Sequence, residues 1–299
     1  MTTTPPKPSA PWAVLQIPKP IQQLFNKFPL VTYPSNDLPA RTQTLTSSSV
    51  PTLYIFSTEE GALTGLPSFN PTCLKWQTLL RLTRTPHRVL PSTNHASPTG
   101  SLPFLLTPQN SNPISTSRLP DYISKKGTNP LPTTTSAETS TKEDAFLSLL
   151  TPLRNAFLYS LYLLPQHTLL LNKLYISPSS SSTLIRNTLR YQLRSAAAAS
   201  ILQSKNLHPD GGKEQIEEEG IFAEAKEALE ALAGGLATSE TVWFFGRERA
   251  GEFDAAVFGY LFLMLVYMDE GLGKVVREVG GGVLESFCRR VAGECGWDV

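Results

Sequence analysis

Apolar and polar positions follow two different periods along the chain, and the change comes near residue 143. Before it, short apolar runs rich in aromatic and β-branched residues are bounded by Pro, Gly, Ser and Thr, which is typical of strands separated by turns. Strands are predicted at residues 52–57, 87–92, 101–107 and 113–117. Two segments with helical spacing, 68–85 and 118–127, predict helices within this half.

The start of the first predicted helix carries two specific signals. Asn70 is a favoured N-cap, and Pro71 suits the first helical position, where its missing N–H would have no partner. The order strand, helix, strand, loop, strand, strand, helix matches a thioredoxin-like unit, which places a cis-proline just before its third strand. Pro103 stands there and serves as a marker of this fold. The alternative is an ordinary trans proline at the start of a strand.

Beyond residue 143, apolar residues recur at spacings of three and four, as on one face of a helix. A stripe over residues 146–164 predicts a helix that Pro152 kinks or restarts, with Thr151 as the cap if it restarts. Further helices are predicted at about 182–205, 214–237, 254–268 and 283–293. The run 255–268 is apolar nearly all round and, at fourteen residues, is too short to cross a bilayer, so it predicts a central bundle helix.

These patterns predict an α+β fold class with four segments. A thioredoxin-like α/β domain occupies residues 51–127, and an all-α helical domain occupies residues 143–299. Residues 1–50 are rich in Pro, Ser and Thr and predict an extended arm with one anchoring segment, IQQLFNKFPLVTY. Residues 128–142 are of low complexity and predict a linker between the domains.

The net charge of +1 conceals a division between the two ends of the chain. Residues 1–206 carry 18 Lys and Arg against 7 Asp and Glu, whereas residues 207–299 carry 8 against 18. One end is therefore suited to anionic lipid or an acidic protein and the other to a basic partner, unless the two neutralise each other within the fold. The near-neutral pI and the lack of aromatic residues among the basic ones disfavour nucleic acid as a partner.

Two sets of basic residues are candidate partner-binding surfaces. Arg186, Arg190 and Arg194 recur every four residues and line one face of a predicted helix, where a partner's carboxylates or lipid phosphates would relieve their repulsion. A looser second set consists of Lys75, Arg81, Arg84 and Arg88. The alternative for both sets is a basic face that only meets solvent.

Residues with catalytic or metal-binding chemistry are few and far apart. The three cysteines, Cys73, Cys288 and Cys295, predict neither a disulfide framework nor a zinc site. Cys73 falls at the third position of the first helix, where the helix dipole favours a thiolate, but no C-x-x-C pair accompanies it. We interpret it as a buried structural residue. The four histidines have no metal-ligand spacing, so we expect no catalytic residue, no metal site and no cofactor.

Three passages resemble a known family. Residues 243–261 (WFFGRERAGEFDAAVFGYL) resemble the signature late in the helical half of glutathione-transferase-like proteins, especially the metaxins. Residues 70–77 (NPTCLKWQ) and 94–104 (NHASPTGSLPF) resemble the first helix and the stretch before the third strand of metaxins. The resemblance covers roughly residues 20–295 and implies a glutathione-transferase-like fold. In that fold the buried helix begins with a hydroxyl N-cap and an Asp three residues on. Here Gly251 replaces the hydroxyl while Asp254 remains as a fold marker, so we expect a weakened cap.

The same resemblance implies a non-catalytic role at the mitochondrial outer membrane. Metaxins belong to the sorting and assembly machinery, which inserts β-barrel precursors. The implied partners are the barrel subunit of that machinery, a second metaxin-like subunit, the β-barrel precursors and the membrane surface, to which the protein attaches peripherally on the cytosolic face. Its implied task is to help recognise the sorting signal of the precursor. Two alternatives stay open: a glutathione-dependent transferase with a reactive Cys73, and a soluble transferase-like scaffold unrelated to mitochondria.

Overall fold

The structure is a computed structural model that describes residues 49–297 except 109, 130, 133–136 and 208–215. The chain divides into two compact units, residues 1–37 and 38–299, and every described residue lies in the second. The predicted extended arm and its anchoring segment therefore lie outside the described residues, apart from positions 49 and 50.

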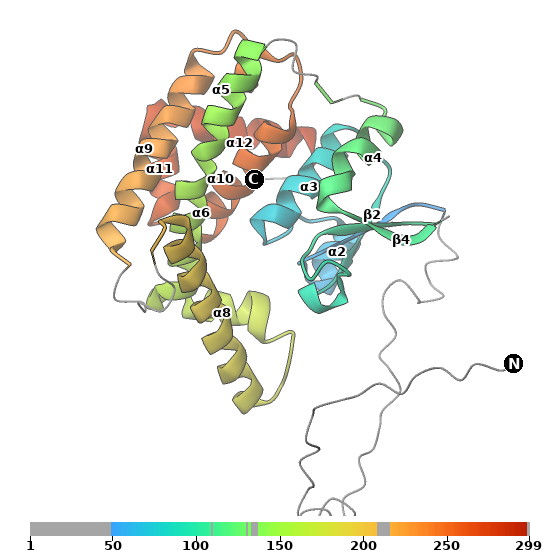
Figure 1. Ribbon diagram of the computed structural model, residues 1–299, viewed down its shortest axis with the longest axis vertical. Coiled ribbons are helices and arrows are strands. Elements are labelled where there is room, and N and C mark those ends of the chain that lie inside the picture. Colours follow the sequence, from blue (N-terminus) through green and yellow to red (C-terminus); the bar gives the residue numbers. More distant parts are fainter. Residues whose placement is uncertain (1–48, 109, 130, 133–136, 208–215, 298–299) are drawn as a thin grey trace, which may run out of the picture. The chain divides into compact units, whose positions relative to one another are not determined.

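A four-stranded mixed sheet forms the core of the first half (Figure 1). Its strand order is β2-β1-β3-β4, with β1 parallel to β2 and antiparallel to β3, and β3 antiparallel to β4. The strands are β1 (Thr52–Ile55), β2 (Arg88–Pro91), β3 (Phe104–Thr107) and β4 (Asn110–Ser115). All four β1 residues are buried, as expected of a central strand that is covered on both faces. The four predicted strands are confirmed, although β4 begins earlier and ends earlier than its predicted range.

Helices pack against this sheet through a continuous apolar cluster. Trp76 and Leu79 of α3 (Pro71–Leu82) and Ile123 of α4 (Leu119–Lys126) meet Leu53 and Leu105 of the central strands. Both helices were predicted. The short helix α2 (Glu59–Thr64) was not predicted. Thr58 caps its start, and Gly65 in the left-handed conformation caps its end. The fold is thus a thioredoxin-like sheet with helices, as the sequence predicted.

In the part that the structure describes, the second half contains helices joined by loops and no strand. Its longer helices are α5 (Ala137–Ser148), α6 (Leu150–Leu158), α8 (Thr183–Ser204), α9 (Glu218–Ala237), α10 (Glu252–Tyr267), α11 (Leu272–Glu278) and α12 (Val283–Glu294). Between α6 and α8 lie the shorter segments η5 (Tyr159–Leu163), η6 (Pro165–His167), α7 (Thr168–Leu171) and η7 (Asn172–Ile176). The predicted helices are confirmed, while α11 and the short segments were not anticipated.

The break in the first long helical stripe lies earlier than predicted. α6 restarts at Leu150 after a one-residue interruption, so Pro152 falls in its first turn and Thr151 lies inside the helix rather than capping it. Proline is tolerated there because the first N–H groups of a helix have no intrahelical partner. α5 begins at Ala137, within the range that the sequence assigned to the linker.

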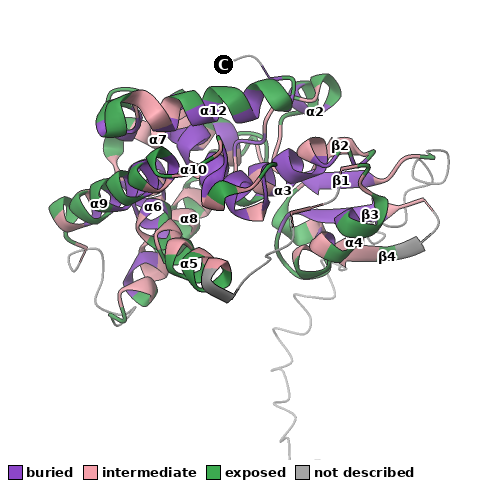
Figure 2. Ribbon diagram, turned by 90° about the horizontal axis from the view of Figure 1, so that it is seen from above, coloured by how far each residue is buried: buried purple, intermediate pink, exposed green. Residues whose placement is uncertain are grey.

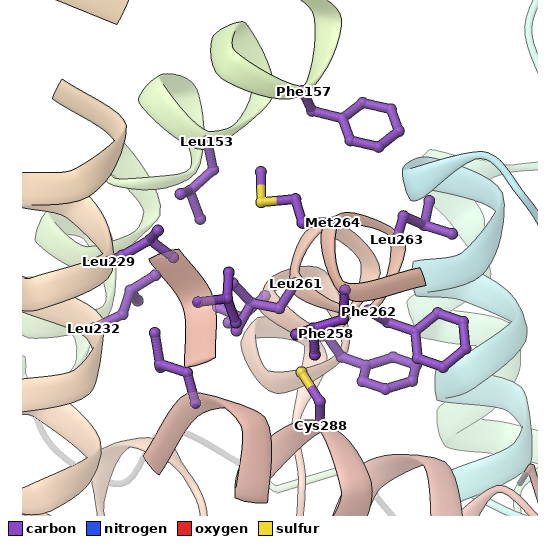
Figure 3. Close-up of a cluster of buried hydrophobic side chains, with 14 of the residues drawn as sticks. Leu153, Phe157, Leu229, Leu232, Phe258, Leu261, Phe262, Leu263, Met264 and Cys288 are labelled. Carbon is purple, nitrogen blue, oxygen red and sulfur yellow. The ribbon is translucent and has the colours of Figure 1, made fainter. Parts of the chain in front are cut away.

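α10 is the centre of the helical half. Its residues from Phe253 to Leu265 are buried with the exception of Tyr260, which is half-buried, and α10 is purple in Figure 2. Side chains from α6 and α9 surround it, as do those of α12, including Leu153, Leu229 and Cys288 (Figure 3). The prediction of a central bundle helix is confirmed.

α10 also joins the two halves, because α3 packs directly against it. The close approach depends on Gly259: a Cβ there would stand 2.8 Å from the carbonyl oxygen of Pro71. The first turn of α3 is therefore fixed between the sheet and the central helix.

Candidate functional site

The start of α3 is the place where a thioredoxin-like fold would present a reactive group. The Asn70 side chain caps the helix by accepting a hydrogen bond from the Cys73 N–H at 3.1 Å, and Pro71 occupies the first position. Both predicted signals are confirmed. Asn70 is selected here because its short side chain reaches back to an amide that the helix leaves without a backbone partner.

Cys73 itself has no access to solvent. Its exposed fraction is 0%, and burial raises the pKa of its thiol to about 12, against the weaker opposing effect of hydrogen bonds with Phe56 and Ser68. Burial also raises the pKa of Cys295 to about 12 and that of Cys288 further still. The thiolate is the nucleophilic form of cysteine, so none of these three groups is prepared for attack on a ligand.

An aromatic cluster lies over the first turn of α3. Tyr175 of η7 is at its centre, with its ring centroid 5.0 Å from that of Phe69 and 5.3 Å from that of Phe56. The Asn70 amide donates a hydrogen bond to the Tyr175 hydroxyl at 3.4 Å, and the Tyr162 ring follows at 5.8 Å. Burial raises the pKa of Tyr175 well above its usual value, so this hydroxyl stays neutral. The protein's own side chains thus cover the Asn70 cap, whereas Thr72 in the first turn stays exposed.

A cleft of about 600 Å³ opens between α3, α6, α10 and the turn η4 (Thr116–Arg118). Its size falls within the range of small-molecule sites. Across it, the Lys75 ammonium and the Glu252 carboxylate form an ion pair at 2.6 Å. The other polar side chains that line it are those of Thr72, Thr116, Ser117, Thr151, Arg154 and Tyr260. Because the charged pair neutralises itself, the remaining polar groups of this mostly apolar cleft are hydroxyl groups and the guanidinium of Arg154.

The structure does not bring Lys75, Arg81 and Arg84 onto one surface. Lys75 lines the cleft just described, whereas Arg81 and Arg84 line a separate hollow of about 640 Å³. Arg81 donates hydrogen bonds to the carbonyl oxygens of Cys295 at 2.6 Å and Gly65 at 2.7 Å, and its guanidinium lies over a tryptophan ring near the chain's end. Arg81 therefore links the two halves of the fold, while Arg84 is exposed.

The second basic set does share one helix face. Arg186 donates to the Ser177 hydroxyl at 2.7 Å, and Arg194 donates to the Leu163 carbonyl oxygen at 2.9 Å. Arg190 donates to the Asn172 side chain at 3.0 Å. All three fasten α8 to the segment that precedes it and stay half-buried. Within the described residues their partners are neutral, so their positive charges are not cancelled by a carboxylate.

Both predicted fold markers occupy structural positions. The Leu102–Pro103 bond is cis, directly before β3. Asp254 is fully buried, and its carboxylate accepts hydrogen bonds from the Gly251 N–H at 2.8 Å and the Phe244 N–H at 3.0 Å. The expectation of a weakened cap was incomplete, because the second bond compensates for the missing hydroxyl by holding the turn η10 (Phe244–Gly246) against α10. Burial raises the pKa of Asp254 to about 6.

Sequence reasoning missed several residues that define this region. Tyr175 lies in a π-helical segment, whose turns break the 3.6-residue period by which helices are recognised. Glu252 was visible only as an acidic residue near a predicted helix start. Trp297 follows the last predicted helix, and no local pattern indicated that its indole N–H donates to the Gly65 carbonyl oxygen at 2.9 Å.

The described residues contain no group of three or more His, Cys, Asp or Glu side chains arranged to hold a metal ion. No single described helix has the length and apolar composition of a membrane span, although α10 and residues 272–294 pass that test together across a 115° bend.

Comparison with protein families identifies the scaffold. The glutathione S-transferase N-terminal domain matches residues 71–167, and the glutathione S-transferase C-terminal domain matches residues 225–291. The chain therefore carries both domains of a glutathione-transferase-like fold, a thioredoxin-like sheet followed by a helical domain, as the sequence predicted. No curated protein matches the chain.

Solved structures agree with this assignment. Glutathione transferase GSTFuA3 from Phanerochaete chrysosporium is similar with a TM-score of 0.55 at 15% identity, covering 85% of this chain and 100% of that one. GSTFuA2 from the same organism gives 0.53 at 16% identity, covering 84% and 100%. The glutathione S-transferase CsGST63524 of Ceriporiopsis subvermispora, solved with glutathione, gives 0.50 at 12%, covering 82% and 97%. At these identities the likeness shows the fold alone.

Proposed function

We propose that the protein is a non-catalytic, metaxin-like subunit of the mitochondrial outer-membrane sorting and assembly machinery. Its sequence resembles in particular the fungal thirty-five kDa subunit of that machinery. In this role it sits on the cytosolic face, attached peripherally to the membrane and to the barrel subunit, beside a second metaxin-like subunit. There it helps to recognise the sorting signal of β-barrel precursors and assists their insertion.

The burial of Cys73 in the first turn of α3 is the observation that carries the non-catalytic part of this proposal. A thiol transferase must bring its ligand's sulfur to a polar or reactive group at the beginning of this helix. Here the cysteine in the first turn is fully buried, and Tyr175 lies over its cap. A scaffold that keeps the transferase architecture but buries this cysteine is suited to binding rather than to chemistry at its thiol.

The metaxin-like passages support the assignment to the sorting machinery. They correspond to α3, to the loop before the cis bond at Pro103 and to the segment from η10 into α10. Of these elements, α3 and α10 meet where the sheet and the helical half are joined. Two of the three passages therefore include residues that fix the relation between the two domains.

A precursor's sorting signal is a strand with alternating apolar residues, and such a strand is suited to adding itself to the edge of a sheet. In the described sheet, β2 and β4 each have one neighbour. Pro91 and Pro113 remove N–H groups from these strands, so an added strand would pair over few residues. Side-chain pockets would then contribute most of the specificity.

A glutathione-dependent transferase is the second candidate, and one observation favours it. Thr72, at the second position of α3, is exposed and lines the 600 Å³ cleft together with Thr116 and Ser117. A hydroxyl at a helix start is able to donate a hydrogen bond to a bound thiolate, where the helix dipole also favours negative charge.

A mild-detergent affinity purification of the tagged chain from mitochondria separates these candidates. Mass spectrometry of the purified material is paired with a glutathione-binding titration and with carbonate extraction of the membranes, and an untagged strain serves as the control. Recovery of the barrel subunit in near-equal amount, release by carbonate and no glutathione binding are expected. Recovery of the chain alone with glutathione bound would overturn the proposal in favour of the transferase.

A further inference from the structure

The first half of α8 exposes large apolar side chains that nothing in the described structure covers. Leu184 is 77% exposed and Tyr191 is 75% exposed. They are seven residues apart, so both lie on one face of the helix. All the buried residues of α8 lie in its second half, from Ala197 to Leu202. In Figure 1 the first half of α8 projects below the rest of the helical domain, and η7 packs against α8.

A third apolar residue adds to this surface. Ile185 follows Leu184 on α8 and is 49% exposed. We call Leu184, Ile185 and Tyr191 the apolar tip. Single exposed apolar residues are ordinary on protein surfaces, but three large ones within two turns of one helix mark an interaction site.

The charge around the apolar tip has one sign. From residue 145 to residue 209 the sequence contains no Asp or Glu. Lys173 of η7 is exposed, and Arg186, Arg190 and Arg194 line α8 with only neutral hydrogen-bond partners among the described residues. The region is therefore positively charged, and that charge has no internal counter-ion in the described structure.

We propose that the apolar tip and its arginines dock on the surface of an anionic lipid bilayer. Leucine and tyrosine side chains insert at the boundary between headgroups and acyl chains, while arginine and lysine remain at the level of the phosphates. A stable protein interface instead has a core depleted of charge and buries a broad area. The narrow tip flanked by basic groups fits the lipid surface better. This inference rests on the proposed peripheral attachment and identifies the surface responsible for it.

The arginines of α8 also hold this helix against the segment that precedes it. Their hydrogen bonds to Ser177, Asn172 and the Leu163 carbonyl oxygen hold η7 and α8 side by side. The apolar tip is thus carried on a braced pair of segments and needs no ordering when it meets the bilayer. Pre-ordering of this kind lowers the entropic cost of binding.

The test is a vesicle flotation assay with the full chain. Neutral phosphatidylcholine vesicles are compared with vesicles in which roughly one third of the lipid is anionic. The double variant Leu184→Ser/Tyr191→Ser is expected to bind anionic vesicles about tenfold more weakly than the wild type, because two exposed anchors are lost. Leu63→Ser on α2, where the leucine is 87% exposed, is the matched control and should bind as the wild type does. Equal binding by all three proteins would overturn the proposal.

A second readout locates the insertion. The three native cysteines are buried, so a cysteine introduced as Tyr191→Cys or Leu63→Cys takes an environment-sensitive fluorophore selectively. The label at position 191 should brighten on anionic vesicles, and less so at about 0.5 M salt, while the label at position 63 should not change. An unchanged signal at position 191 would also overturn the inference.

Vesicle binding and recovery of the barrel subunit from mitochondria test the lipid docking and the proposed function separately. Loss of vesicle binding with retention of the barrel subunit in the variant supports lipid docking. Loss of the barrel subunit with unchanged vesicle binding assigns α8 to a protein partner and overturns lipid docking, while leaving the proposed function standing. Conversely, vesicle binding by a chain that recovers no barrel subunit supports the inference and contradicts the proposed function.

Discussion

The Lys75 ammonium lies 2.6 Å from the Glu252 carboxylate, and this pair joins the second turn of α3 to the first turn of α10. The two side chains are 23% and 42% exposed, so water screens the pair only in part. A few residues further along α10, Gly259 allows the backbone of α3 to approach closely. The sheet and the helical half therefore share one interface, and we expect them to unfold together.

A double-mutant cycle with Lys75→Ala and Glu252→Ala tests the contribution of this pair. A coupling energy of about 0.5–1 kcal/mol is expected for a partly exposed pair of opposite charge, and it should decrease at high salt. Chemical denaturation of the four proteins measures it. The exposed pair Lys274–Glu278, at 3.8 Å within α11, is the control and should give about 0.3 kcal/mol or less. A coupling at Lys75–Glu252 no larger than this would show that the pair has no role in joining the halves.

Gly259→Ala should destabilise the protein by about 1–3 kcal/mol. The added Cβ would lie 2.8 Å from the Pro71 carbonyl oxygen, and that oxygen belongs to the backbone of α3, which cannot turn away as a side chain would. Gly234→Ala in α9 is the matched control, because no atom lies within 4 Å of its Cβ position. That change should stabilise by about 0.5–1 kcal/mol, since alanine favours helix. Thermal unfolding distinguishes the two, and similar effects at both sites would contradict the close packing of α3 on α10.

The native protein should react slowly with thiol reagents. All three cysteines are buried, and burial raises the pKa of Cys73 to about 12. Near pH 8 the ionised fraction of this thiol is then less than about one hundredth of the ionised fraction of a free cysteine. Alkylation followed by mass spectrometry should therefore be at least about a hundredfold slower in the native state than in denaturant. Rapid labelling of Cys73 alone would favour the transferase.

A variant that opens the aromatic cluster around Tyr175 can be tested in the same alkylation assay. Tyr175→Ala removes the ring over the first turn of α3 and should speed alkylation of Cys73 severalfold, while the rates at Cys288 and Cys295 should stay unchanged. Acceleration at all three residues would indicate general destabilisation. No acceleration at any of them would show that Tyr175 does not protect this cysteine.

The sequence was sufficient to predict the sheet, the cap at Asn70 and the central helix, because each depends on local chemistry. Asn70 and Pro71 are adjacent signals, and the apolar run of α10 is continuous. It did not indicate α2, since a helix of six residues is too short to establish a period, although Thr58 and Gly65 are favourable caps. Helical spacing thus identifies long elements more readily than short ones.

The candidate site was harder to predict because its contacts are between distant parts of the chain. The spacing of Arg186, Arg190 and Arg194 indicated a shared face but not that they bind η5 and η7. Arg81 bonds to two carbonyl oxygens, and backbone acceptors have no signature in the sequence. The position of Tyr175 depends on π-helical turns, which periodicity does not reveal.

Asp254 should be the most sensitive position in the helical half. Its carboxylate accepts hydrogen bonds from the N–H groups of Gly251 and Phe244, and Asp254→Ala would leave both donors buried without a partner. A loss of about 2–4 kcal/mol is expected from the cap and the two bonds together. The alternative substitution Asp254→Asn keeps the shape and one acceptor, so it should lose less. Urea denaturation of the three proteins measures the order.

The contribution of Asp254 to stability should decrease as the pH rises. Burial raises the pKa of Asp254 from 3.8 to about 6, so the folded state binds this proton more tightly than the unfolded chain does. The contribution of this group to stability is therefore fully present below about pH 4 and is lost as the pH rises through about 6. Asn at this position does not titrate. The difference in unfolding free energy between the wild type and Asp254→Asn should accordingly narrow between pH 4 and pH 6. A difference that widened over this interval would mean that the two amide donors lower the pKa of Asp254 more than burial raises it.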